Sequence, residues 1–300
     1  MKSRIRVYVT ILFLVGLPLL GLGSCSSTHL GLPQTPVRTV TPVPSPNLVP
    51  AKPISLVAHR GSAGLAAENT LTAFRIGIAF NSDFLEMDVH LTKDGVPIVM
   101  YDPTINRTTD GKGRIADMTL AELGRFSTHS TSQSYREPIP TLAQVLDLAQ
   151  SKHVQVEVEI KVDVDNKRYP GIEQKVLDEL AVRNMLDRVR ILAFEFDTLK
   201  QVRAINPCVK TVALMSVDSF RSMGNSEPVA MIDDVASFSD GISVNKDLLS
   251  AQLVEAAHNR KLFVGVWAVD TASEMQKFFE MGVDSITTNR PDVFVQVLRK

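Results

Sequence analysis

From residue 54 onward, short strand-like segments alternate with longer helix-like ones. The short segments are apolar or alternate apolar with polar residues, whereas the longer ones carry apolar residues at helical spacing. Strands are predicted at 54–59, 83–91, 97–101, 154–160, 189–194, 210–214, 240–244, 262–267 and 284–287. Helices are predicted near 68–80, 119–126, 141–151, 171–184, 197–204, 228–236, 250–259, 272–280 and 291–298. Such alternation favours a parallel sheet covered by helices.

One of the nine predicted strands runs against the others. Only Thr92-Lys93-Asp94-Gly95-Val96 separates strand 83–91 from strand 97–101, whereas a parallel crossover needs about a dozen residues. Asp-Gly is a hairpin turn, so strand 97–101 should be antiparallel. The other eight strands, each followed by a helix, predict an α/β fold, a (β/α)8 TIM barrel with an extra hairpin strand after strand two. An open doubly wound sheet is the alternative, but no glycine-rich dinucleotide fingerprint follows any strand.

The first 53 residues have a different character. Three basic residues precede an apolar run over 7–23, the layout of a secretory signal. Leu22-Gly23-Ser24-Cys25 resembles the bacterial lipobox, which implies cleavage before Cys25 and a lipid on its sulfur. We therefore expect a signal peptide over 1–24 and an exported protein, lipid-anchored to a bacterial membrane, with its folded domain outside the cytoplasm. A plain signal peptide with a chance cysteine is the alternative.

Residues 25–53 form a linker. They contain seven of the sixteen prolines and no acidic residue, which predicts an extended, semi-rigid spacer. The folded domain then covers 54–300, a length that suits one barrel. Its composition is globular, with 44% hydrophobic and 22% charged residues in the whole chain. A net charge of −1 lacks the basic excess of a nucleic-acid-binding protein, so no nucleic-acid partner is expected.

Acidic residues occupy one face of two predicted strands. Alternation places Glu86 and Asp88 of strand 83–91 on one face and Glu159 of strand 154–160 on the corresponding face. Because the opposite faces are aliphatic, the charged faces should point into the barrel. Several carboxylates in one barrel mouth are costly without compensation, and a hard divalent cation, Mg²⁺ or Ca²⁺, would provide it. Salt bridges to Arg60 and Lys161 alone are the alternative.

A divalent metal ion beside Arg60 and Lys161 would form, together with these side chains, a binding site for phosphate. Metal and cationic side chains together neutralise a phosphodiester and the charge of its transition state. His59 lies next to Arg60 at the end of the first strand, and an imidazole transfers protons near neutral pH. The strand ends therefore indicate phosphodiester chemistry.

The motifs of the chain resemble the glycerophosphodiester phosphodiesterase family over residues 54–298. The resemblance rests on His59-Arg60-Gly61, Glu68-Asn69-Thr70, Phe84-Leu85-Glu86-Met87-Asp88-Val89, Thr92-Lys93-Asp94-Gly95, Asn106-Arg107-Thr108-Thr109, Ile139-Pro140-Thr141-Leu142, Glu159-Ile160-Lys161, Trp267 and the segment Gly282 to Pro291. It implies a barrel that hydrolyses glycerophosphodiesters to glycerol 3-phosphate and an alcohol.

The resemblance also implies roles for individual residues. Glu86, Asp88 and Glu159 match the metal ligands, and His59 matches one of two acid–base histidines. Arg60 and Lys161 match the cations that contact phosphate. Trp267, at the end of its strand, lines the mouth against substrate or simply packs there.

One departure from the family pattern concerns the second histidine. The family ends the hairpin strand with His-Asp, whereas this chain has Tyr101-Asp102. A phenol ordinarily titrates near pH 10, so Tyr101 can donate a proton but is a poor shuttle at pH 7. Two alternatives to hydrolysis stay open: a phosphodiester-binding protein with little or no turnover, and a lyase that leaves a cyclic phosphate.

Several polar residues near these motifs receive structural interpretations. His90 is interpreted as a solvated position on the rim, and His129 as exposed in a polar loop over 127–134. Asn69 is interpreted as the N-cap of helix 70–80. Glu157 is expected to pair with a cation inside the barrel rather than to bind metal.

Overall fold

The computed structural model describes residues 53–130, 133–217 and 228–299. The expected signal peptide 1–24, Cys25 and all of the linker except its last residue lie outside these ranges, so their assignment stays a prediction. In the described ranges, no helix has both the length and the apolar character needed to cross a bilayer.

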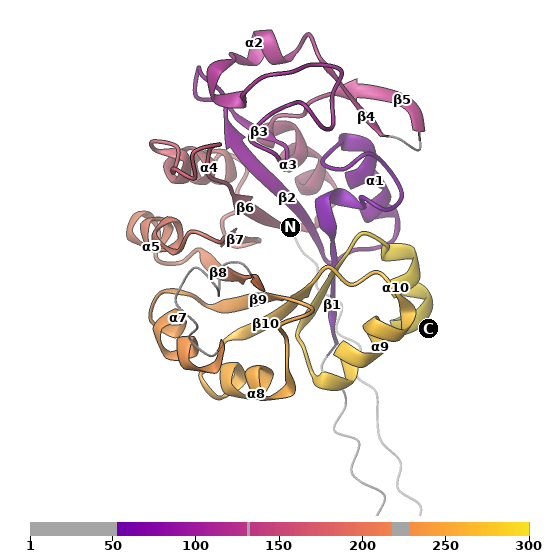
Figure 1. The fold of residues 1–300 in the computed structure, drawn as a ribbon, viewed down its shortest axis with the longest axis vertical. Helices are drawn as coiled ribbons and strands as arrows, with labels where there is room; N and C mark the ends of the chain where they lie inside the picture. Colours follow the sequence, from indigo (N-terminus) through magenta and orange to yellow (C-terminus); the bar gives the residue numbers. More distant parts are fainter. Residues whose placement is uncertain (1–52, 131–132, 218–227, 300) are drawn as a thin grey trace, which may run out of the picture. The chain divides into compact units, whose positions relative to one another are not determined.

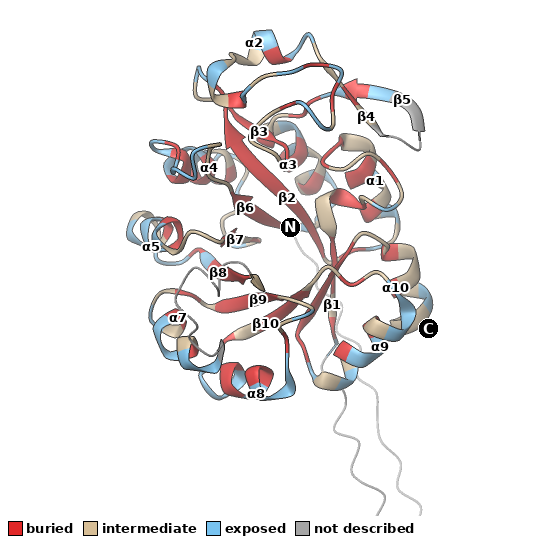
Figure 2. Ribbon diagram, in the orientation of Figure 1, coloured by how far each residue is buried: buried red, intermediate tan, exposed pale blue. Residues whose placement is uncertain are grey.

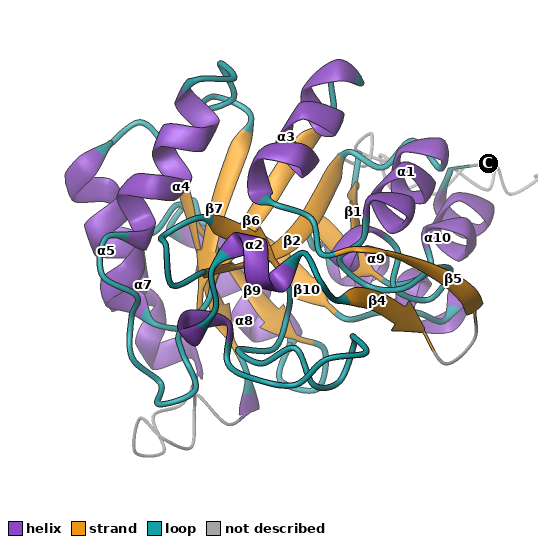
Figure 3. Cartoon of the chain, turned by 90° about the horizontal axis from the view of Figure 1, so that it is seen from above, coloured by secondary structure: helices purple, strands orange, loops and turns teal. Residues whose placement is uncertain are grey.

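Eight parallel strands form a closed barrel (Figures 1 and 3). The sheet closes because β1 pairs in parallel with β11 on one side and with β2 on the other. The barrel strands are β1 Ser55–Ala58, β2 Phe84–Leu91, β6 Gln155–Ile160, β7 Val189–Ala193, β8 Lys210–Met215, β9 Gly241–Asn245, β10 Phe263–Trp267 and β11 Ser285–Thr288. The predicted (β/α)8 barrel is confirmed, and the open sheet was the wrong alternative.

Helices surround the barrel, as the view from above shows (Figure 3). They are α1 Leu71–Ala79, α3 Leu142–Ser151, α4 Ile172–Ala181, α5 Phe196–Ile205, α7 Ile232–Phe238, α8 Ala251–Asn259, α9 Ala272–Met281 and α10 Pro291–Leu298. Helix α3 illustrates the pattern: it begins with a capping box between Thr141 and Gln144 and buries Leu142, Val145, Leu146 and Ala149 on one face. The buried stripe faces the strands, whereas the opposite helix faces are exposed (Figure 2).

The predicted hairpin strand is present as β3 Pro97–Val99, antiparallel to the carboxyl end of β2. Gly95 adopts a left-handed φ of 76° in the turn, a conformation that glycine accepts without steric cost. The hairpin extends the carboxyl end of strand two as predicted, and Tyr101 lies two residues after β3.

A small insertion follows β3. It contains α2 Leu120–Leu123 and a second hairpin of β4 Ser127–Ser130 and β5 Gln133–Pro138. The prediction of a polar loop with an exposed His129 was wrong: His129 lies in β4, is half-buried, and its Nε2 is 2.9 Å from the backbone oxygen of Thr109. These strands carry mostly polar residues, so hydrophobic alternation could not reveal them.

The two faces of the barrel strands differ in polarity. Leu85, Met87 and Val89 of β2 are fully buried in the core against the helices. Inside the barrel, Nη1 of Arg190 lies 2.9 Å from Oε1 of Glu157, and the guanidinium stacks between Phe84 and Phe263, 3.9 Å from each ring centroid. The predicted pairing of Glu157 with a cation is confirmed.

Candidate active site

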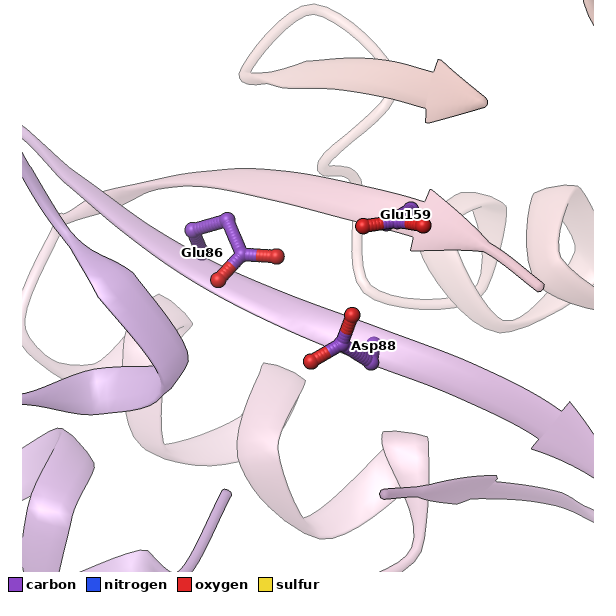
Figure 4. A group of neighbouring side chains, drawn as sticks. All are labelled: Glu86, Asp88 and Glu159. Carbon is purple, nitrogen blue, oxygen red and sulfur yellow. The ribbon is translucent and has the colours of Figure 1, made fainter. Parts of the chain in front are cut away.

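Three carboxylates meet at the barrel mouth (Figure 4). Glu86 and Asp88 come from β2, and Glu159 comes from the neighbouring strand β6, where it is in register with Asp88. One oxygen from each carboxylate lies within 4.8 Å of one from each of the others, and all three residues are buried. Strand alternation together with parallel pairing brings about the convergence that the sequence predicts.

Burial and mutual repulsion disfavour the charged form of two of these carboxyl groups. Burial, together with the charges of Asp88 and Glu159, raises the pKa of Glu86 well above its ordinary value. Burial likewise raises the pKa of Glu159 to about 7. Three buried carboxylate oxygens at this separation are the donor set of a hard divalent cation, so the residues present fit Mg²⁺ or Ca²⁺.

Asp88 differs from its two neighbours. Although burial opposes it, Lys161 and Arg60 lower the pKa of this carboxyl. The Nζ atom of Lys161 lies 3.5 Å from Oδ1 of Asp88 and 2.6 Å from Oε1 of Glu159. The Nε atom of Arg60 lies 3.6 Å from Oδ2 of Asp88. The two cations thus border the carboxylates on which the predicted cation site depends.

Arg60 is held in place by its own backbone and by a second acid. Its backbone N–H donates to Glu86 Oε2 at 2.8 Å, and its Nη1 donates to Glu68 Oε1 at 3.0 Å. Within the described residues, Nε of Arg60 is buried without a hydrogen bond. A buried donor of this kind can bind an anionic oxygen.

His59 lies at the end of β1 and lines the same pocket as Glu86 and Glu159. Its Nδ1 lies 2.7 Å from Oδ1 of Asn289, and Nδ2 of Asn289 donates to Oδ2 of Asp270 at 2.8 Å. Since the Asn289 nitrogen is used by Asp270, its oxygen must accept from Nδ1–H of His59. The tautomer so defined leaves a lone pair on Nε2. Burial, with the adjacent charge of Arg60, lowers the pKa of His59.

The ring of Tyr101 packs against the cationic groups of Arg60 and Lys161. The centroid of its ring lies 3.5 Å from Cζ of Arg60 and 4.3 Å from Nζ of Lys161, and its side chain lines the pocket. The ring face therefore makes cation–π contacts with both groups. At the position where the family pattern has a histidine, this chain thus has an aromatic ring that contacts two cationic side chains.

The interpretation of His90 as a solvated rim position was wrong. His90 is fully buried; its Nε2 lies 3.1 Å from the backbone oxygen of Tyr101 and its Nδ1 lies 2.9 Å from the hydroxyl of Tyr169. Burial lowers the pKa of His90 to about 4. The hairpin and the segment carrying Tyr169 enclose this side chain, which strand alternation alone could not show.

The opposite wall of the pocket is apolar. It is formed by Leu192, Phe194, Leu214 and Trp267. Trp267 packs edge-to-face on Phe194 with 5.7 Å between ring centroids, and its Nε1 donates to the backbone oxygen of Ser243 at 3.0 Å. It therefore both packs and lines the mouth.

Asn69 was misassigned as a helix cap. The N-cap of α1 is Thr70, whose side chain accepts from the backbone of Ala73. Asn69 is instead buried, and its Nδ2 donates to Oδ2 of Asp88 at 2.8 Å. Its place in the Glu68-Asn69-Thr70 motif was the only signal, since nothing in local sequence points to strand β2.

An ion-pair network joins the insertion to the barrel rim. Arg107 contacts both oxygens of Glu68, at 2.6 Å and 3.0 Å, and its Nε donates to Asp102 at 2.6 Å. Because Glu68 also binds Arg60, this network links the segment after Tyr101 to Arg60.

Comparison with known proteins gives a consistent assignment. The model of the glycerophosphoryl diester phosphodiesterase family matches residues 59–293. A glycerophosphodiester phosphodiesterase of Caldanaerobacter subterraneus subsp. tengcongensis is 32% identical over 247 residues, covering 82% of this chain and 98% of that protein. One from Bacillus subtilis is 29% identical over 284 residues, covering 89% and 94%.

Solved structures share the fold. A structure from Agrobacterium tumefaciens, described under the same family name, superimposes with a TM-score of 0.74 at 28% identity, covering 82% of this chain and 98% of that one. An Oleispira antarctica phosphodiesterase, solved with the product sn-glycerol-3-phosphate, has a TM-score of 0.72 at 24% identity, covering 82% and 97%.

Proposed function

The chain belongs to the glycerophosphoryl diester phosphodiesterase family, and we propose that it hydrolyses glycerophosphodiesters to glycerol 3-phosphate and an alcohol with the help of Mg²⁺ or Ca²⁺. The observation that carries the proposal is the cluster of three buried carboxylates at the barrel mouth, with Arg60 and Lys161 beside Asp88. His59 lines the same pocket as two of these carboxylates. Relatives named glycerophosphodiester phosphodiesterase support the substrate class.

The carboxylates of Glu86, Asp88 and Glu159 would hold the divalent cation. When bound, such a cation neutralises phosphate charge and orients the diester. Arg60 and Lys161 would bind the non-bridging phosphate oxygens, because both lie beside Asp88 and Arg60 keeps a buried Nε free of hydrogen bonds within the described residues.

His59 would act as the base. Its Nε2 carries the lone pair because Nδ1–H is donated to Asn289. A lowered pKa keeps the imidazole neutral at pH 7, so Nε2 can accept the proton of the substrate hydroxyl whose oxygen attacks phosphorus. The bond from phosphorus to the alcohol then breaks, and water opens the resulting cyclic phosphate to give glycerol 3-phosphate. Trp267 and the apolar wall would contact the carbon skeleton of the substrate.

Tyr101 raises the question of how the leaving alcohol obtains its proton. Among the described residues that line the pocket, His59 is the one imidazole. We assign proton donation to the Tyr101 hydroxyl. If this donation fails, the site would bind a phosphodiester without turnover. If water does not open the cyclic phosphate, the site would release the alcohol and leave the cyclic phosphate as product.

A product assay distinguishes these outcomes. Glycerophosphocholine and glycerophosphoethanolamine are incubated with purified protein, with chelator or with added Mg²⁺ or Ca²⁺, and products are identified by phosphorus NMR. Metal-dependent release of glycerol 3-phosphate supports the proposal. Binding without release supports the binding protein, and a cyclic phosphate supports the lyase.

Two matched carboxylates test the metal assignment. Glu159→Gln should abolish both cation binding and activity, whereas Glu157→Gln should leave cation binding intact, because Glu157 faces the same interior but pairs with Arg190. Activity that survives chelation and Glu159→Gln would overturn the assignment.

We propose further that the enzyme is exported and held on a bacterial membrane by a lipid on Cys25. The support is the sequence around Leu22-Gly23-Ser24-Cys25 and the proline-rich linker that follows it. Cys25→Ala should move the protein from the membrane fraction to the soluble or secreted fraction without changing its activity. A membrane-bound Cys25→Ala variant would refute the lipid anchor.

A further inference from the structure

Asn69 occupies an unusual environment for an amide. It is 3% exposed and has a left-handed φ of 57°, a conformation that asparagine tolerates better than most residues. Its backbone N–H donates to the backbone oxygen of Arg60 at 2.9 Å. The backbone of Asn69 is thereby tied to the loop that carries His59 and Arg60.

The amide of Asn69 contacts one oxygen of Asp88. Nδ2 donates to Oδ2 at 2.8 Å, and Nε of Arg60 lies 3.6 Å from the same oxygen. The other oxygen, Oδ1, lies 3.5 Å from Nζ of Lys161. Asn69 and Arg60 both contact Oδ2, whereas Lys161 contacts Oδ1. These different partners of the two oxygens fix the orientation of the Asp88 carboxylate.

A second observation separates Asn69 from an ordinary structural amide. Its Oδ1 is buried without a hydrogen-bond partner among the described residues. An unpaired buried acceptor is unfavourable for stability, and glycine would meet the left-handed backbone without one. What asparagine adds at this position is the hydrogen bond from its Nδ2 to Asp88.

We propose that Asn69 is a positioning residue, which orients Asp88 for the divalent cation. This inference rests on the proposed cation site. Groups that hydrogen-bond to metal ligands set the ligand orientation, and their loss typically lowers metal affinity about 10- to 100-fold. The same loss is expected here, with little change in the rate of the cation-saturated enzyme.

The test uses the single tryptophan of the chain. Trp267 lines the same pocket as Glu86 and Glu159, so terbium bound to the carboxylates is detected by luminescence excited through the indole, and Mg²⁺ or Ca²⁺ is measured by its displacement. Asn69→Gly removes the amide while glycine still accepts the left-handed backbone. Its dissociation constants should rise about 10- to 100-fold, and kcat at saturating cation should stay within about threefold of wild type.

Asn184→Gly is the matched control. Asn184 is also a left-handed asparagine, with φ 52°, but it is exposed and lies after helix α4. It should bind terbium like the wild type. Thermal melting checks that each variant is folded; if Asn69→Gly is not, Asn69→Ser replaces it.

The outcomes separate the two proposals. Wild-type protein that binds neither terbium nor Mg²⁺ nor Ca²⁺ would overturn the cation site and this inference with it. Wild-type binding with equal affinity in the folded Asn69 variant would overturn this inference alone. A kcat that stays low at saturating cation would show that Asn69 contacts substrate instead.

Discussion

Nδ1 of His59 lies 2.7 Å from Oδ1 of Asn289, a residue 230 positions further along the chain. Asn289 is in turn fixed by Asp270, which accepts from both its side-chain and its backbone nitrogen at 2.8 Å. These hydrogen bonds select the tautomer of His59 that carries its proton on Nδ1, and they fix the orientation of the ring with its basic Nε2. Closure of the barrel, which sets β11 beside β1, makes the contact possible.

Removal of the Asn289 amide should impair the base without affecting cation binding. We expect Asn289→Ala to lower kcat about 10- to 100-fold and His59→Ala to lower it about 10²- to 10⁴-fold. Because Asn289 acts through His59, the double variant should be no slower than His59→Ala. Steady-state kinetics measure this; Asn245→Ala, at the end of β9, is the control. Additive losses in the double variant would contradict the relationship.

The activity should depend on pH through His59. The base must be neutral, so the rate rises as pH increases through the pKa of His59 and levels off above it. Since burial and Arg60 lower that pKa, the acidic limb should be centred below pH 6.5 in a profile of kcat/KM at saturating cation. A limb centred above pH 6.5 would argue against His59 as the base.

Cation binding should weaken as pH falls from 8 to 6. In the metal-free site the pKa of Glu159 is raised to about 7, with burial as the main cause. A divalent cation must therefore displace a proton below this pH, and the dissociation constant should rise up to about tenfold per pH unit for each displaced proton. Calorimetry in buffers of different ionisation enthalpy counts the protons. Binding without proton release at pH 6 would refute this prediction.

Substitutions at Tyr101 should separate its ring from its hydroxyl. Tyr101→Phe keeps the ring over Arg60, so KM should change less than about twofold while kcat falls with the lost proton donor. Tyr101→Ala removes cation–π contacts worth about 1 kcal/mol, so KM should rise about fivefold as well.

Tyr101→His provides the complementary measurement. If Tyr101 supports turnover, a histidine at this position should change kcat less than about tenfold. A much larger increase would indicate that the natural protein turns over poorly, as the phosphodiester-binding alternative requires. Product analysis of the variant by phosphorus NMR also tests for cyclic phosphate.

Local sequence patterns were sufficient to predict the barrel and the direction in which the residues of its strands point. Alternation along β2 and β6 is a local property of extended chain, and it places Glu86, Asp88 and Glu159 on the inward face whatever the loops do. The Asp-Gly turn and the short spacing before β3 likewise determine an antiparallel hairpin without reference to the rest of the molecule.

The surroundings of these side chains depended on contacts between distant segments. Alternation placed His90 correctly on its strand, but its burial came from the hairpin and from Tyr169. Asn69 looked like a helix cap until the first loop folded onto β2, and Asn289 reached His59 only because the barrel closed. Periodicity records the direction of a side chain within its own element, whereas its partners are set by packing between elements, which no local pattern encodes.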